Sequence, residues 1–259
     1  MHNTRNHDKV VSEQFGSTAA AYLTSTVHAQ GQDLQQLAAY AQQFPQATVL
    51  DVGCGGGHVS FAMAPHAGKV IAYDLASEML EVVQGAARER GLNNLEVRQG
   101  SADRLPFADA SFDLVCSRFS AHHWKNLPQA LAEMARVLKP GGKCIVIDTA
   151  SPEDVLADTY LQSIELLRDS SHVRNRSVSA WHQLLAQAGF TPVSDKQWKL
   201  PLQFDTWVAR MRTPAERVIA IKSLWDSAPA EVSAYFDLRQ DYSFSIDTVL
   251  LEVNKKILF

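Results

Sequence analysis

The segment formed by residues 48–74 constrains the fold more than any other part of the chain. An apolar run at residues 49–52 leads into a glycine-rich turn, a short helical segment follows, and a second apolar run ends at the acid Asp74. Short β-branched apolar runs are typical of parallel strands that are covered on both faces. The order of strand, glycine turn, helix and strand predicts a nucleotide-binding β-α-β unit, and with it an α/β fold.

The glycine-rich turn predicts a place where the backbone comes close to a ligand. Gly53 and Gly55 can adopt positive φ, and neither carries a side chain that would keep a ligand away. Asp51 interrupts the first apolar run, and a carboxylate at that point is costly unless it meets a partner. Asp74 follows Gly53 by 21 residues, the distance at which an acid binds a ribose diol. The other interpretation is a tight strand-to-helix turn followed by an ordinary N-capping acid.

The turn departs from two common nucleotide-binding motifs. The dinucleotide fingerprint needs glycine where the chain has His58, and the Gly-Lys-Ser/Thr ending of the phosphate-binding loop is absent. The sequence LDVGCGGG at residues 50–57 instead resembles the first motif of class I S-adenosylmethionine-dependent methyltransferases, and Asp74 resembles their ribose-binding acid. The resemblance implies that the glycine backbone and Asp51 border the methionine portion of this cofactor.

The same resemblance implies which residues surround the adenine ring. Asp103 would accept a hydrogen bond from the adenine amino group, the backbone of Ala102 would meet the ring, and Leu75 and Met79 would enclose it. Each assignment has a structural alternative. Asp103 can be a turn-forming residue beside Pro106, and the two apolar side chains can belong to the core.

A predicted strand at residues 112–117 directs attention to the residues that follow it. Ser117 ends the strand at the edge of the sheet where ligands bind in this architecture, so we expect it to contact the cofactor. His122 and His123 come next, where the family commonly has a histidine or aromatic residue facing the transferred methyl group. Histidine can act as a base near neutral pH. We assign His123 as the catalytic candidate; the alternative is a capping or core histidine.

The sequence FGSTAAAY at residues 15–22 resembles one branch of the family in particular. In the ubiquinone- and menaquinone-biosynthesis (methyltransferase type 11) branch, an aromatic residue and small residues in this segment cover the cofactor pocket. Tyr22 is therefore expected either to cover the pocket or to pack within a helix.

The resemblance implies a Rossmann-like class I methyltransferase fold, with a mostly parallel seven-stranded sheet, helices on both faces and helical cap insertions. Residues 190–202 and 244–255 are expected to be its last two strands, the final one antiparallel. Thr213 and Glu216 have the spacing of a capping box and predict a helix start. We expect a single domain, residues 1–259, with the following parts: an N-terminal helical cap at 1–45, a cofactor-binding core at 46–150, and a C-terminal part at 151–259 with a helical insertion at about 204–240.

Composition limits the partners and the compartment. The chain has 24 Lys and Arg against 28 Asp and Glu, a net charge of −4, which disfavours nucleic acid as a partner. Its three cysteines are widely spaced, which favours reduced thiols in the cytoplasm over disulfides or zinc. The polar N-terminus lacks the apolar core of a signal peptide, and no run approaches the ~20 apolar residues of a membrane span. No cluster of metal ligands is evident, so no metal is expected.

These observations predict direct in-line methyl transfer from S-adenosylmethionine to a small-molecule acceptor. Because the donor is already activated, the protein must mainly align the reactants and exclude water. A base is needed only where the acceptor loses a proton. Quinone precursors, small aromatic or aliphatic acids and lipophilic metabolites all fit, and the oligomeric state is left open. Two other functions are a non-catalytic S-adenosylmethionine-binding or regulatory protein and, disfavoured by the missing third glycine, a nicotinamide-dependent oxidoreductase.

Overall fold

The centre of the structure, a computed structural model that describes residues 5–16 and 31–256, is a seven-stranded sheet. The strand order is β3-β2-β1-β4-β5-β7-β6, and β1 to β5 pair in parallel. These five strands are β1 (Thr48–Val52), β2 (Lys69–Asp74), β3 (Leu95–Gln99), β4 (Phe112–Arg118) and β5 (Leu138–Ala150). The predicted mostly parallel seven-stranded sheet is confirmed, and residue 22 lies outside the described residues.

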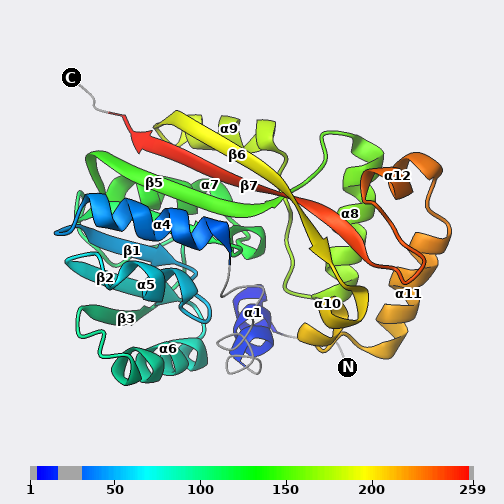
Figure 1. Cartoon of the computed structure of the whole chain (residues 1–259), viewed down its shortest axis with the longest axis horizontal. Helices are drawn as coiled ribbons and strands as arrows, with labels where there is room; N and C mark the ends of the chain where they lie inside the picture. Colours follow the sequence, from blue (N-terminus) through cyan, green and yellow to red (C-terminus); the bar gives the residue numbers. More distant parts are fainter. Residues whose placement is uncertain (1–4, 17–30, 257–259) are drawn as a thin grey trace.

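The last two strands also match their predicted ranges. β7 (Phe244–Lys255) runs antiparallel to β5, with Ile147 opposite Leu250, and β6 (Phe190–Leu202) runs antiparallel to β7. Both are long, and Figure 1 shows them running from the parallel core to the far end of the molecule. β6 is a largely exposed edge strand. Its two prolines and several charged side chains disfavour pairing with another chain.

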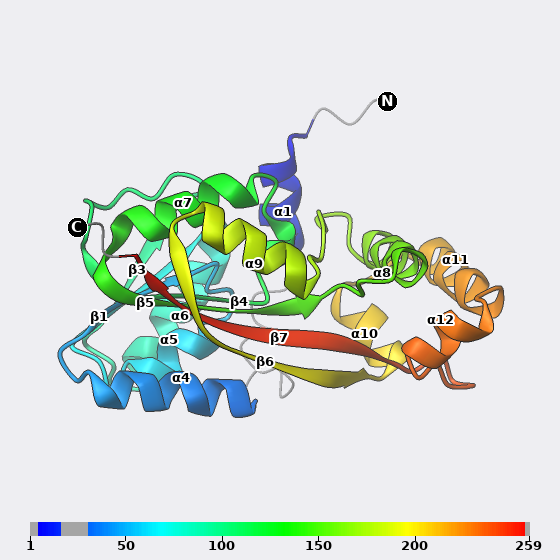
Figure 2. The ribbon, with the colours of Figure 1, turned by 90° about the horizontal axis from the view of Figure 1, so that it is seen from above.

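Helices cover both faces of the sheet, as predicted (Figure 2). One face carries α4 (Gln32–Gln43), α5 (His58–Met63) and α6 (Ser77–Glu89), and the other carries α7 (Leu127–Val137) and α9 (Val178–Gln187). Alternation along β1 explains this arrangement, because successive strand residues point to opposite faces. Val49 is buried in the cluster that contains α4 and α5, whereas Leu50 and Val52 are buried in the cluster that contains α7 and α9.

Four helices form a cap at the far end of β6 and β7 (Figure 1). They have a core of their own that includes Trp207, Trp225 and Phe236 together with Phe244 of β7. The four are α8 (Val155–Arg168), α10 (Phe204–Arg210), α11 (Ala215–Asp226) and α12 (Ala230–Tyr235). The last three lie within the predicted insertion, whereas α8 comes from the segment between β5 and α9; the division of the chain into parts stays a prediction.

The predicted capping box at the start of α11 is wrong. The helix begins at Ala215 after Pro214, and no side chain caps it. The Thr213 hydroxyl instead donates a hydrogen bond to the carbonyl of Arg168, at 3.0 Å. A long-range contact to the end of α8 therefore takes the hydroxyl that a local motif would have used.

One helix stands apart from both the core and the cap. α1 (His7–Gly16) has no buried residue and lies between them (Figure 1). Its Asp8 pairs with Lys125 of the core at 2.9 Å, and its Gln14 donates to the carbonyl of Met211 at 3.0 Å. α1 thus bridges the two halves by polar contacts. No helix in the described part of the chain has the length and hydrophobicity needed to cross a bilayer.

Candidate functional site

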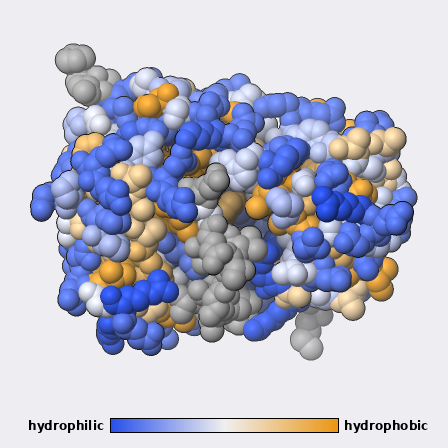
Figure 3. All heavy atoms as spheres, viewed as in Figure 1, coloured by the Kyte–Doolittle hydropathy of each residue, from blue (hydrophilic) through white to orange (hydrophobic). Residues whose placement is uncertain are grey.

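A cavity of about 820 Å³ lies where the carboxyl ends of the parallel strands meet the cap and α1. This edge of an open α/β sheet is where ligands bind, and the volume is typical of a small-molecule site. A hollow is visible in the middle of the face shown in Figure 3, with hydrophobic side chains at its edges. The predicted site residues that line the cavity are Asp51, Gly53, Gly55, Asp74, Leu75, Ala102, Asp103 and His123.

The glycine turn is shaped as its sequence requires. Gly53 has a φ of 71°, and a Cβ built on it would lie 1.9 Å from the Ser120 hydroxyl oxygen, so no larger residue fits. Gly55 has a φ of 49° and lines the cavity, where an added Cβ would meet no described atom within 4 Å. The backbone of the turn therefore forms an open cradle against which a ligand can lie.

Asp74 connects this turn to the end of β2. One carboxylate oxygen accepts from the backbone N–H of Gly55 at 2.8 Å, and the other accepts from the N–H of Ala76 at 2.9 Å. Burial raises the pKa of this carboxyl group, while the backbone donors oppose the rise. Each carboxylate oxygen can accept a further bond, so Asp74 has the capacity to receive two hydroxyl groups.

Asp51 is a buried carboxylate in the cavity wall with one unsatisfied oxygen. Its Oδ2 accepts from the backbone N–H and the hydroxyl of Ser60, at 3.1 and 2.7 Å. Its Oδ1 is buried and has no hydrogen-bond partner among the described residues. Burial raises the pKa of Asp51 to about 7, and the side chain is 1% exposed. Since an unpaired buried carboxylate oxygen is costly, a cationic donor in the cavity would stabilise it.

Three of the predicted adenine residues follow the ends of β2 and β3, and the fourth, Met79, is buried in α6 and also lines the cavity. Gly100 donates its N–H to the carbonyl of Asp74 at 3.0 Å, which brings the residues after β3 beside Leu75. Leu75, Ala102 and Asp103 all line the cavity. They supply an apolar wall with one carboxylate.

Ser117 is placed differently from the other predicted site residues. It is buried in β4, and it is absent from the cavity lining. The next residue, Arg118, does line the cavity and forms a buried ion pair with Asp33 of α4, with 2.5 Å between Nε and Oδ2. The two residues are 85 positions apart, so no local sequence pattern indicates the pair.

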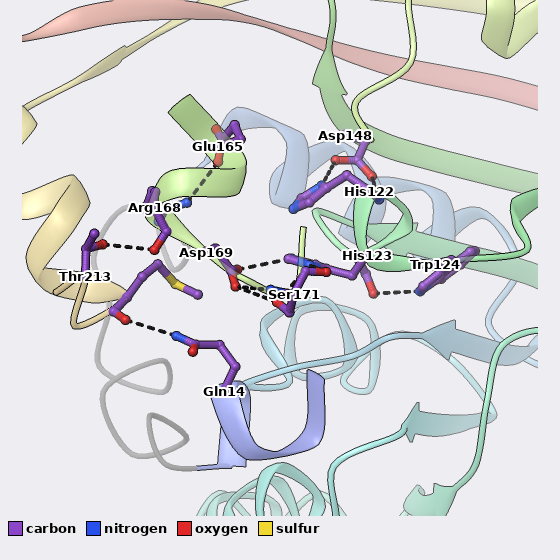
Figure 4. A network of polar contacts seen from close by, with 12 residues as sticks. Gln14, His122, His123, Trp124, Asp148, Glu165, Arg168, Asp169, Ser171 and Thr213 are labelled. Atoms are coloured by element: carbon purple, nitrogen blue, oxygen red, sulfur yellow. Dashed lines mark hydrogen bonds and ion pairs between the residues drawn. The ribbon is translucent and has the colours of Figure 1, made fainter. Parts of the chain in front are cut away.

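His122 faces the cavity from the short helix η1 (Ala121–His123). Its Nδ1 lies 2.5 Å from Oδ1 of Asp148, and its backbone N–H donates to Oδ2 of the same carboxylate at 3.2 Å (Figure 4). Burial opposes a charge on this ring, but the Asp148 carboxylate, with Glu165 and Asp169, outweighs burial and raises the pKa of His122. His122 and Asp148 therefore form a tightly held imidazole–carboxylate pair.

His123 has neighbours at both ring nitrogens. Its Nδ1 lies 3.1 Å from the carbonyl oxygen of Ser171, and its Nε2 lies 4.0 Å from Oδ2 of Asp169 (Figure 4). The edge of the Phe15 ring packs against it, with the centroids 4.8 Å apart. Burial, followed by the neighbouring charge of His122, lowers the pKa of His123 to about 4. His123 is thus an uncharged part of the wall near neutral pH.

A third histidine, His172, completes this group. Its ring centroid lies 5.9 Å from that of His122, and burial, with the charges on His122 and His123, lowers its pKa to about 2. The three rings therefore differ sharply in their readiness to take a proton.

Among residues 5–16 and 31–256, no group of three or more histidine, cysteine or acidic side chains has an arrangement that could hold a metal ion.

Comparison with known proteins gives the family. A family model described as a methyltransferase domain matches residues 50–146. The chain is 46% identical to the uncharacterised protein YafE of Escherichia coli over 203 residues, 78% of this chain and 98% of YafE. It is 34% identical to the uncharacterised methyltransferase YcgJ of Bacillus subtilis over 247 residues, 93% of this chain and 98% of YcgJ. The crystal structure of YcgJ matches with a TM-score of 0.84 over 88% of this chain and 99% of that one.

This chain belongs to the methyltransferase family. The predicted resemblance to its type 11 branch is confirmed, since demethylmenaquinone methyltransferases are among the relatives. The enzyme of that name from Lactococcus lactis is 35% identical over 122 residues, 46% of this chain and 47% of that protein. This likeness is limited to less than half of either chain, whereas the likeness to YcgJ includes most of the methyltransferase, cap included.

Sequence reasoning missed most of the polar groups around the histidines of this methyltransferase. Asp148 carried a usable signal, because the apolar run at residues 144–147 ends on it, just as the run before Asp74 ends on an acid. The acids Glu165 and Asp169 lie at the end of a cap helix and in the loop that follows, and no motif indicates that they reach the cavity. Their place depends on how the cap packs.

Proposed function

We propose that this methyltransferase uses S-adenosylmethionine as its methyl donor and acts on a small molecule. The observation that carries the proposal is the buried Oδ1 of Asp51, which has no partner among the described residues and lies beside an open glycine cradle. An amino-acid ammonium group would supply the missing donor and the positive charge. Asp74, on the other side of Gly55, suits a ribose diol.

The remaining cofactor contacts follow from the lining of the cavity. Gly53 and Gly55 offer their backbone to the amino-acid tail, while Leu75 and Ala102 offer an apolar wall to adenine and Asp103 accepts from its amino group. When bound, S-adenosylmethionine supplies an activated methyl group, whose bond to the sulfonium sulfur breaks with both electrons left on sulfur. The protein's share of catalysis is alignment and the exclusion of water.

The cap side of the cavity supports a small, partly apolar acceptor. Trp198, Leu200, Trp207 and Met211 line it, and charged side chains lie among them. The charged residues of this part are Glu165, Arg168, Asp169, Lys196 and Arg210. His123 forms the wall between the two parts, so we propose that it contacts the bound acceptor.

Two measurements test this function. Calorimetric titration of the purified protein with S-adenosylmethionine should give saturable binding, and titration with nicotinamide dinucleotides should give none. Incubation with S-adenosylmethionine and fractionated metabolite extract should release S-adenosylhomocysteine with at least one fraction. Binding without release in any fraction would indicate a regulatory S-adenosylmethionine-binding protein, and tight binding of a nicotinamide cofactor would contradict the proposal.

A further inference from the structure

The two histidines of η1 present different atoms to the cavity. Nδ1 of His122 is occupied by Asp148, and within residues 5–16 and 31–256 no hydrogen bond is formed to its Nε2. In Figure 4 the edge of the His122 ring opposite Asp148 points toward the space between His123 and Glu165. The His122 side chain is 17% exposed, whereas Asp148 is 1% exposed. A buried carboxylate thus fixes a ring whose other nitrogen is open to a ligand.

The hydrogen-bond pattern also fixes the tautomer of each ring. A carboxylate can only accept, so Nδ1 of His122 carries a hydrogen and Nε2 carries the lone pair when the ring is neutral. For His123, the Ser171 carbonyl likewise holds the hydrogen on Nδ1, but its Nε2 faces the Asp169 carboxylate at 4.0 Å. Of the two rings of η1, His122 directs into the cavity a basic nitrogen that no acid faces at close range, whereas Nε2 of His123 lies beside the Asp169 carboxylate.

We propose that Nε2 of His122, held in place by Asp148, accepts the proton that the acceptor loses on methylation, and that the acceptor is a phenol or an enol. This inference rests on the proposed function. Such hydroxyl groups are weak acids, and they become strong nucleophiles at oxygen or at the conjugated carbon once a base removes the proton. An amine acceptor attacks with a free lone pair and has no comparable need for a held base. Asp148 binds His122 and the backbone N–H of Thr149 and does not touch the acceptor, so it is a positioning residue.

The atoms and charges balance in this step. The O–H bond of the acceptor breaks, and its electron pair stays on oxygen. In methylation at oxygen, an oxygen pair forms the new bond to the methyl carbon; in methylation at carbon, the C=C pair forms that bond while the oxygen pair forms a C=O bond. The proton binds the lone pair of Nε2, which makes His122 an imidazolium ion beside the Asp148 carboxylate. The donor leaves as neutral S-adenosylhomocysteine, so the positive charge that entered with the sulfonium group is now on His122. The proton passes to solvent when the products leave.

The surroundings of His122 favour this proton transfer. The acidic groups of Glu165 and Asp169 face it from the cap side, and Asp148 faces it from β5. Arg168 of α8 is bound to Glu165 at 3.3 Å, and the neighbouring rings of His123 and His172 have lowered pKa values. Of the three rings, only His122 has a raised pKa, so it holds a proton more readily than the other two. Turnover should therefore rise with pH as His122 loses its proton.

A nuclear magnetic resonance titration of the wild-type protein tests the base without any acceptor. With ¹⁵N-labelled histidine, His122 should show a hydrogen on Nδ1 and a lone pair on Nε2 at high pH, and it should titrate above an ordinary histidine. Asp148→Asn should lower that pKa. A hydrogen on Nε2, or a pKa below that of a free histidine, would overturn the proposal.

Turnover gives the second test. His122→Asn keeps an amide N–H for Asp148 and removes the basic nitrogen, so S-adenosylhomocysteine release should fall about 10²–10⁴-fold, with S-adenosylmethionine affinity kept. His182→Asn is the matched control, because His182 forms an exposed pair with Asp195 at 3.6 Å on α9, outside the cavity. It should leave turnover unchanged. In Asp148→Asn, the rise of turnover with pH should move to lower pH.

An error in the proposed function and an error in the role of His122 give different experimental results. If the wild-type protein neither binds S-adenosylmethionine nor releases S-adenosylhomocysteine, the proposed function is wrong, and the titration of His122 decides the base separately. If the wild-type protein is active but His122→Asn keeps its turnover within twofold, or if the methylated product is an amine, only the present inference is wrong.

Discussion

The proposed donor side and the proposed acceptor side of the cavity are built in different ways. On the donor side, Asp51 and Asp74 stand at the ends of neighbouring strands of one β-α-β unit, within 24 residues of sequence. On the acceptor side, His122 meets Asp148 from another strand, while Glu165 and Asp169 come from the cap. The first arrangement is local to one β-α-β unit. The second joins η1 to β5 within the core, and it gains Glu165 and Asp169 only when the cap packs on the core.

This contrast separates binding from chemistry. The donor side holds carboxylates that a ligand must satisfy, so changes there should act on cofactor affinity. The acceptor side holds rings that are already fixed by protein partners, so changes there should act on turnover. The following substitutions test whether that separation holds.

The largest effect is expected for Asp51→Asn. Because burial raises the pKa of Asp51 from 3.8 to about 7, the ionised carboxylate destabilises the ligand-free fold. This cost begins as pH rises above the unfolded value and is complete above pH 7, where it corresponds to at most ~4 kcal/mol at ~1.4 kcal/mol per unit. Denaturant unfolding should show the variant more stable than wild type, and more so at pH 8 than at pH 5.

The same variant should bind S-adenosylmethionine poorly. Asp51→Asn should therefore raise the free energy of unfolding and at the same time weaken cofactor binding. In the wild-type protein, affinity should fall as pH drops below about 7, by up to ~10-fold per unit, because the ammonium group needs the ionised form of Asp51. Calorimetry at several pH values measures this directly. Ser77→Ala, a nearby change on α6 outside the cavity lining, is the control. Unchanged affinity between pH 5 and 8 would contradict the role of Asp51.

The next effect is expected for Asp74→Ala. Loss of two hydrogen bonds between a carboxylate and a ribose diol should weaken cofactor affinity by ~2–4 kcal/mol, since each charge-assisted bond is worth ~1.5–3 kcal/mol and water replaces part of it. Turnover at saturating cofactor should change less than affinity. Calorimetry that gives wild-type affinity would remove the ribose assignment, and loss of turnover alone would break the separation between the two sides.

A smaller effect is expected for His123→Ala. His123 is proposed to contact the acceptor, and one ring contact that is made in the transition state is worth ~0.5–1.5 kcal/mol, which is about 2- to 10-fold in rate. Turnover should therefore fall by that factor, with cofactor affinity kept. Steady-state kinetics beside calorimetry measures both. Turnover equal to wild type would assign His123 a purely structural role, and a larger fall than in His122→Asn would exchange the roles of the two rings.

The same contrast explains which parts the sequence could predict. The sheet, its two final strands and the wall formed by Gly53, Gly55 and Asp74 follow from apolar periodicity and from residues at strand ends, which are local signals. Ser117 satisfied the same rule but is buried away from the cavity, because alternate residues of a strand point to opposite faces. The Arg118–Asp33 pair joins residues that only the complete fold brings together.

The smallest effect is expected for Lys125→Ala, which tests whether α1 contributes to acceptor binding. The helix buries none of its residues. Besides the contact of Phe15 with His123, it touches the core through the Asp8–Lys125 pair, whose side chains are 38% and 50% exposed. Because exposed ion pairs contribute ~0–1 kcal/mol, Lys125→Ala should change the free energy of unfolding by less than ~1 kcal/mol. Lys139→Ala, which removes another partly exposed pair away from the cavity, is the matched control. If α1 only covers the cavity, Lys125→Ala alone should also raise the acceptor KM slightly, whereas equal behaviour of the two variants would make α1 irrelevant to the acceptor side.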